Sequence, residues 1–135
     1  MRALPSEVWE ALTNPEKTKK YFFNCEVNSD WRAGAEITFK GRLFFFKKIE
    51  MSGVIEKIEA GKLLQYTLKN RGGGHSRVIE KITYENGMTT LTVTDDVGSS
   101  TGAEKRMRMS QKGWDKVLGG LQEMVEKESK TLMKF

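Results

Sequence analysis

The residues that most often carry catalysis are few in this chain and lie far apart in its sequence. His75 is the only histidine and Cys25 the only cysteine. A nucleophilic cysteine needs a base beside it, and a metal site needs several His, Cys or carboxylate ligands that converge. We therefore expect Cys25 to fill apolar space at the start of a strand and His75 to lie in a solvated loop. The sequence predicts no cofactor and no bound metal.

Two further motifs favour turns over chemistry. Asp95 and Asp96 form an adjacent acid pair at a predicted strand end, but neighbours in an extended segment point to opposite faces and cannot act together on one substrate. The run Gly72–Gly74 could cradle a phosphate, yet no Gly-Lys-Ser/Thr follows it and no helix is expected to begin there. We expect a turn at the acid pair, a flexible hairpin loop at the glycines, and no catalytic residue.

An apolar binding site is the chemistry that the other residues could support. Side chains suited to its walls are available along the chain: Trp9, Phe22, Trp31, Phe39, Phe45, Tyr66, Met107, Trp114 and Leu118. Core packing explains most of them taken singly. However, a sheet wrapped around one helix has difficulty filling the concavity between them, and aromatic walls with polar tips suit flat apolar ligands. We predict as ligand-lining residues Trp31, Phe39, Phe45, Tyr66, Met107, Trp114, Leu118 and Leu121.

Two short helices are predicted at the start of the chain. Pro5 suits a first-turn position of a helix over 5–13. Asn14 and Pro15 then supply an N-cap and a first residue for a second helix that ends near residue 22.

Alternation of apolar and polar residues then predicts an antiparallel sheet. Asn86-Gly87 is a strong hairpin signal, because both turn positions need a positive φ. Connections this short join antiparallel neighbours. The expected strands cover residues 25–27, 36–45, 48–59, 62–69, 76–85 and 88–95.

A long helix is predicted over 103–131. One apolar stripe recurs at three- and four-residue intervals and must pack on the sheet: Met107, Ser110, Trp114, Val117, Leu118, Leu121, Val125 and Leu132. Gly113, Gly119 and Gly120 interrupt this helix, and a glycine in a helix interior costs roughly 1 kcal/mol relative to alanine. Two explanations are open: the absent side chains let strands approach the helix closely, or they leave room for a ligand.

The composition is that of one globular domain over residues 1–135, with 38% hydrophobic and 30% charged residues. No apolar run approaches the roughly 20 residues that span a bilayer, and the start lacks the apolar region of a secretory signal, so we expect a cytoplasmic protein. The net charge of +5 would favour an acidic partner. The cations are interleaved with acids, however, which indicates solvated faces and neither nucleic-acid nor membrane binding.

These elements carry the residues of a known family. The matching pieces are 8–16 (VWEALTNPE), 29–34 (SDWRAG), 52–55 (SGVI) through 66–67, 90–94 (TLTVT), and Gly113-Trp114 with Leu118 and Leu121. In this order they resemble the bacterial Hsp90-ATPase-activator-like proteins of the START/Bet v 1-like helix-grip superfamily, over nearly the whole chain. The resemblance implies an α+β helix-grip fold, in which a curved antiparallel sheet wraps around a long C-terminal helix and leaves an apolar cavity between them.

The chain departs from this family's pattern at its start. Family members usually have a strand ahead of the first helix, whereas only Met1–Leu4 precede it here. Either that strand is very short here or it is missing, and its absence would leave the strand over 88–95 with an unpaired edge, which invites association with another chain. We nevertheless expect a monomer.

Three functions are open at this point. The first is non-catalytic binding of a small hydrophobic molecule, aromatic or lipid-like, between the sheet and the last helix. The second is interaction with an Hsp90-type chaperone, which the family's name implies and the basic charge permits. The third is a polyketide cyclase/dehydratase-like activity found elsewhere in the superfamily, for which Asp30, His75 or Asp95 could act at the cavity mouth.

Overall fold

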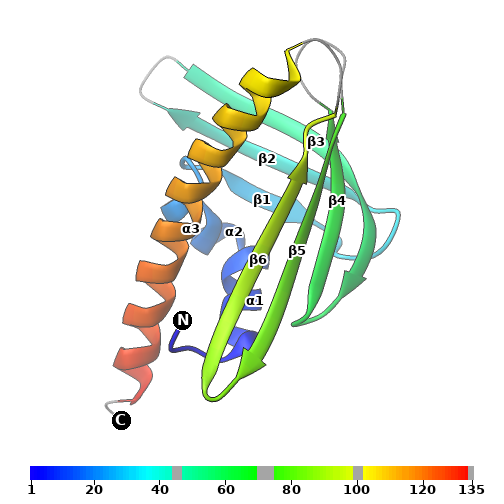
Figure 1. Cartoon of the computed structure of the whole chain (residues 1–135). Coiled ribbons are helices and arrows are strands. Elements are labelled where there is room, and N and C mark those ends of the chain that lie inside the picture. The colour runs from blue at the N-terminus through cyan, green and yellow to red at the C-terminus, as the bar shows by residue number, and fades with distance from the viewer. Residues whose placement is uncertain (44–46, 70–74, 99–101, 134–135) are drawn as a thin grey trace.

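Two short helices, a sheet and a long helix make up the structure, a computed structural model that describes residues 1–43, 47–69, 75–98 and 102–133. In chain order its elements are α1 (Pro5–Thr13), α2 (Pro15–Tyr21), β1 (Glu26–Ser29), β2 (Glu36–Leu43), β3 (Lys47–Glu59), β4 (Leu63–Lys69), β5 (His75–Glu85), β6 (Met88–Asp96) and α3 (Ala103–Met133) (Figure 1). This order confirms the predicted α+β fold. Within the described residues, no helix is both long and apolar enough to span a membrane.

The helices α1 and α2 begin where Pro5, Asn14 and Pro15 predict. Glu7 Oε1 accepts a hydrogen bond from the Leu4 N–H (3.1 Å), and Asn14 Oδ1 accepts one from the Glu16 N–H (3.0 Å). These bonds satisfy backbone donors that a helix N-terminus otherwise leaves free. Tyr21, the last residue of α2, donates its hydroxyl hydrogen to the Ala11 carbonyl (2.7 Å). This bond fixes α2 against α1.

The strands form one antiparallel sheet, in which each strand pairs with the next along the chain in the order β1-β2-β3-β4-β5-β6. Asn86 and Gly87 have φ of 52° and 75°, as the predicted hairpin between β5 and β6 requires. The sheet is curled, and α3 lies across its concave side (Figure 1). The predicted helix-grip arrangement is therefore confirmed.

The first residues of the chain lie along the outer edge of β6. The Met1 amino group donates to the Thr89 carbonyl (2.7 Å), and the Thr89 N–H donates to the Met1 carbonyl (2.9 Å). Such reciprocal bonds are those of an antiparallel strand pair. The Thr89 hydroxyl also donates to the Ala3 carbonyl (2.5 Å). The beginning of the β6 edge is therefore paired.

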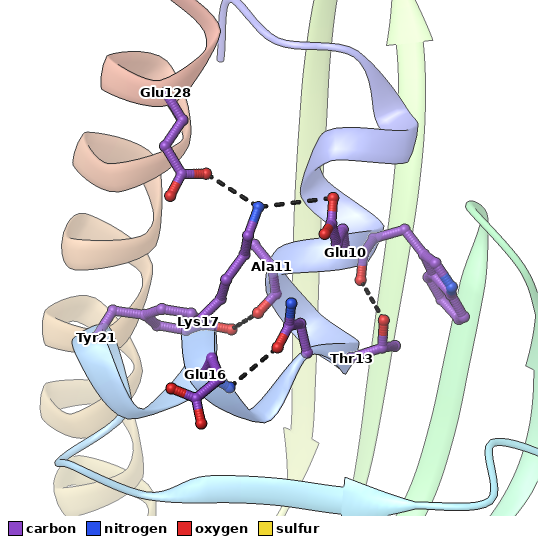
Figure 2. A network of polar contacts seen from close by, with 9 residues as sticks. Glu10, Ala11, Thr13, Glu16, Lys17, Tyr21 and Glu128 are labelled. Carbon is purple, nitrogen blue, oxygen red and sulfur yellow. Dashed lines mark hydrogen bonds and ion pairs between the residues drawn. The ribbon is translucent and has the colours of Figure 1, made fainter. Parts of the chain in front are cut away.

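The second half of α3 is fixed against the two short helices. A Cβ added to Gly120 would lie 3.2 Å from the Tyr21 Cβ, so the backbones of α3 and α2 are in close contact there. Lys17 on α2 adds ion pairs with Glu128 on α3 (3.1 Å) and Glu10 on α1 (3.6 Å), as Figure 2 shows. This half of α3 is therefore held firmly against α1 and α2.

The hydrophobic core consists of two groups of side chains. One lies between α1, α2, the second half of α3 and β5 and includes Val8, Ala11, Tyr21, Ile82, Val117, Leu121 and Val125. The other covers the concave face of the sheet and includes Val27, Ile37, Phe39, Ile55, Leu64, Tyr66 and Val78. Trp9, Phe22 and Trp114 pack against both groups. These three aromatic side chains therefore join the helices to the sheet.

We expect Gly119→Ala to raise the free energy of unfolding by about 1 kcal/mol, the difference in helix propensity between alanine and glycine. Gly119 is exposed, and nothing lies within 4 Å of an added Cβ. Gly120→Ala is the matched control, because the 3.2 Å approach to Tyr21 offsets the same gain there. Urea denaturation measures both changes, and equal stabilisation by the two variants would contradict the close helix contact.

Candidate functional site

A groove with about 340 Å³ of space lies between the first half of α3 and the concave face of the sheet. Its walls are mainly apolar and include Phe22, Phe23, Met51, Leu68, Val78, Val97, Met109, Trp114 and Val117. Polar groups enter from Tyr66, Ser76, Asp95, Arg106 and Ser110. Sites for small molecules typically measure about 300–1,000 Å³ and combine apolar walls with a few polar groups. The groove has the size and lining of such a site.

The spacing of residues along the strands and along α3 places these side chains on the two facing sides of the groove. Tyr66 and Leu68 are two residues apart on β4 and face the same side of the sheet, where Val78 on β5 lies opposite Tyr66. On α3, Gly113 and Val117 are one turn apart and share the face that looks into the groove. Local periodicity therefore accounts for both sides of the groove.

A small interior gap of about 20 Å³ adjoins the groove on the side of α1 and α2. The groove and the gap share the side chains of Phe22, Tyr66, Trp114 and Val117. Other walls of the gap include Phe39, Leu64, Glu80, Leu118 and Leu121. Such a volume holds about one water molecule. The interior beside the groove is therefore nearly filled, and of these two spaces the groove is the one of ligand size.

Asp95 connects β6 to α3 at the groove. Its Oδ2 accepts hydrogen bonds from Ser110 Oγ (2.6 Å) and Trp114 Nε1 (3.0 Å), whereas its buried Oδ1 has no partner. The expectation that Asp95 serves a turn is therefore wrong, because its side chain faces α3. Asp96 does serve the turn, since its Oδ1 accepts from the Gly98 N–H (2.9 Å).

Glu80 is a buried carboxyl that sequence reasoning missed. It is 4% exposed, its Oε1 accepts a long hydrogen bond from the Tyr66 hydroxyl (3.5 Å), and its Oε2 has no partner. Burial raises the pKa of Glu80 to about 8, and burial next to this carboxyl also raises the pKa of Tyr66 well above its ordinary value. The signal was present in the sequence, because alternation along β5 puts Glu80 on the same face as Val78 and Ile82.

Five of the eight predicted lining residues come together between α3 and the sheet, as walls of the groove or the gap. Tyr66 and Trp114 line both the groove and the gap, and Phe39, Leu118 and Leu121 line the gap. That any of them contacts a ligand stays a prediction.

The other predicted residues are not gathered there. Met107 is 58% exposed and lies in a separate depression of about 240 Å³ between α3 and β6, so the prediction that the whole apolar stripe packs on the sheet is wrong for Met107. Trp31 lies in the connection from β1 to β2 and packs, half-buried, against the sheet core. Phe45 and the run 72–74 lie outside the described residues.

The remaining candidates for chemistry are not among the walls of the groove either. Asp30 is exposed and pairs with Arg32 (3.8 Å). His75 is exposed as predicted, although it begins β5 and does not belong to a loop. Cys25 is buried, as predicted.

Phe23 is a groove wall that local sequence patterns did not reveal. It follows α2, and both Phe23 and Asn24 adopt a positive φ, of 49° and 59°. Such a conformation is uncommon for residues other than glycine, and it is not signalled by the spacing of apolar residues. It turns the chain from α2 into β1.

The three glycines of α3 have three different surroundings. Gly120 permits close approach, but the neighbour is α2 and not a strand. Gly119 faces open space. Gly113 forms part of the groove wall, where an added Cβ would meet Phe23 Cζ at 4.0 Å. Gly113 therefore contributes to the space in the groove.

Glu80→Gln is expected to remove a pH-dependent loss of stability. The pKa of Glu80 is about 8 in the folded protein against an ordinary 4.5. Between these values only the unfolded chain releases the proton, so the wild type loses stability as the pH rises through this window. The variant should differ little at about pH 5 and be more stable by about 4–5 kcal/mol at about pH 9. Urea denaturation across this range measures the difference.

Glu56→Gln is a control, because the contribution of Glu56 to stability changes with pH in the opposite direction to that of Glu80. Hydrogen bonds from Arg77 (2.8 Å) and Gln65 (3.2 Å) lower the pKa of Glu56. Its contribution to stability is therefore present above the ordinary value of 4.5 and is lost as the pH falls. If Glu80→Gln followed the wild type at every pH, the buried protonated carboxyl would be contradicted.

Comparison with known proteins agrees with this architecture. The family described as Activator of Hsp90 ATPase homolog 1-like protein matches residues 2–126. Protein NE0264 from Nitrosomonas europaea has a similar structure, with a TM-score of 0.79 and 20% identity over 95% of this chain and 90% of that one. ChR145 from Cytophaga hutchinsonii is 28% identical, with a TM-score of 0.69 over 93% of this chain and 90% of that one.

DynU16, from the dynemicin biosynthetic locus, is 23% identical with a TM-score of 0.75, and the match covers 96% of this chain and 45% of that one. No curated protein matches in sequence. The family match runs from the first helix through the sheet and most of α3. The chain therefore belongs to the Activator of Hsp90 ATPase homolog 1-like family and has the helix-grip fold expected of it.

Proposed function

We propose that this protein binds a small hydrophobic molecule, aromatic or lipid-like, in the groove between α3 and the sheet, without changing it chemically. The observation that carries the proposal is the groove itself, with about 340 Å³ of space and apolar walls such as Phe22, Phe23 and Trp114. An apolar ligand there would remove apolar surface from water, which contributes about 25 cal/mol per Å².

Catalysis is the second candidate, and Glu80 is the observation that favours it. A carboxyl with a pKa of about 8 is mostly protonated at neutral pH and can act as a general acid. Glu80, however, lines the interior gap and not the groove, and Tyr66 is a wall that the two spaces share. A ligand in the groove would meet Tyr66 and not the carboxyl, so binding accounts for the geometry more directly. The biosynthetic locus of DynU16 is compatible with either role.

An Hsp90-type chaperone is the partner that the family description raises. This alternative rests on that description and on the net charge of +5, and neither identifies a docking surface. A salt-sensitive pull-down together with a dose-dependent rise in Hsp90 ATPase activity would favour the chaperone role over the groove.

Gly113→Leu is expected to weaken binding of the neutral apolar dye prodan about tenfold or more, since about 1.4 kcal/mol of lost contact corresponds to tenfold. The leucine side chain would occupy space in the groove, because Gly113 is part of its wall and the nearest atom to an added Cβ is 4.0 Å away. Titration followed by dye fluorescence measures the dissociation constant.

Gly119→Leu is the matched control. It introduces the same side chain on the same helix, at an exposed position with nothing within 4 Å of the Cβ. This variant should bind the dye as the wild type does. Unchanged binding by Gly113→Leu, or an equal loss in both variants, would refute the groove as the binding site.

A further inference from the structure

Positive charge from α3 flanks the groove. Over residues 103–116 the helix carries two acids, Glu104 and Asp115, and five cations, Lys105, Arg106, Arg108, Lys112 and Lys116. Arg106 is a wall of the groove, and Lys116 lies over the ring of another wall residue, Phe23. The two cations are ten residues apart on a helix that rises about 1.5 Å per residue, so about 15 Å of α3 separates them.

Arg106 is itself a wall of the groove, and among the described wall residues it is the one cation. Its Nε donates to the Val97 carbonyl (3.3 Å), just after the end of β6. The side chain is half-buried. A partly desolvated charge interacts more strongly with an opposite charge than an exposed one does.

Lys116 lies over a second part of the wall. Its Nζ is 5.7 Å from the centre of the Phe23 ring, and Phe23 lines the groove. This contact holds the ammonium group at the aromatic wall. Arg106 is therefore the cation that a molecule in the groove can contact, and Lys116 adds positive charge beside the Phe23 wall.

The nearby carboxyls do not provide a matching site for a cation. Asp95 Oδ2 already accepts hydrogen bonds from Ser110 and Trp114, and less than 1 Å² of its Oδ1 is accessible. Glu80 lies in the interior gap, and because burial raises its pKa to about 8 it is mostly uncharged at neutral pH. Arg106 is therefore the charged group that a ligand in the groove would meet directly among the described walls.

We propose that the ligand of this groove is an amphipathic anion, whose apolar body lies along the aromatic walls and whose carboxylate pairs with Arg106. A fatty acid or an aromatic carboxylate has this chemistry. The guanidinium suits a carboxylate because its N–H donors lie in one plane and can bind both oxygens. This inference rests on the proposed function, since it specifies what the groove binds.

Titration calorimetry with decanoate, decanol and decylamine tests the proposal, because the three compounds share an alkyl chain and differ in the charge of the head group. We expect the wild type to bind decanoate about fivefold more tightly than decanol, as one partly exposed charge pair allows, and decylamine most weakly. Added salt should reduce the preference for decanoate, since screening weakens the charge interaction.

Arg106→Gln should remove most of the preference for decanoate and leave the affinity for decanol unchanged. Arg106→Lys keeps the charge and should retain part of the preference. Lys81→Gln is the control, because Lys81 is exposed on β5 and is not a groove wall. It should bind all three compounds as the wild type does.

The outcomes separate this inference from the proposed function. If none of the three compounds binds, the proposed function fails and the inference fails with it. If they bind equally, or if decylamine binds best, the groove is a binding site but the ligand is not an anion. An unchanged preference in Arg106→Gln would overturn the pairing with Arg106.

Discussion

The groove exists because the two halves of α3 are held by different means. The second half contacts α2 directly at Gly120, where an added Cβ would lie 3.2 Å from Tyr21. The first half is connected to β6 through side chains, with Asp95 accepting hydrogen bonds from Ser110 and Trp114. The backbones of α3 and α2 therefore touch in the second half of the helix, whereas in its first half side chains bridge α3 and β6. The space under the first half follows from this difference.

The two carboxyls on the concave side of the sheet have different physical roles. Asp95 accepts two hydrogen bonds from α3 that are shorter than the one Glu80 accepts, and it thereby holds α3 in place. Glu80 has one long hydrogen bond and an oxygen without a partner, and burial, which disfavours the charged form, raises its pKa. Alternation along β5 places it between Val78 and Ile82, where an apolar residue would pack at lower cost. A polar group at such a position is typical of binding and active sites.

The sequence predicted those parts of the structure that depend on neighbours along the chain. Asn86-Gly87 specified its hairpin, and the alternation of β4 placed Tyr66 on the concave side. The missed parts depend on residues far apart. Asp95 reads as a turn residue until α3 brings Trp114, nineteen positions later, within 3.0 Å of it. Phe23 reaches the groove through a positive φ that no spacing of apolar residues encodes.

Gly113 gives a physical reason to connect the open groove with binding. An interior helix glycine costs about 1 kcal/mol relative to alanine, and a Cβ at this position would meet Phe23 at an ordinary contact distance of 4.0 Å. Stability alone would therefore favour a larger residue, which would also cover the apolar walls. Gly120 differs, because Tyr21 leaves little room there. Packing explains Gly120 but not Gly113, whereas an apolar ligand would bury the surface that Gly113 leaves open to water.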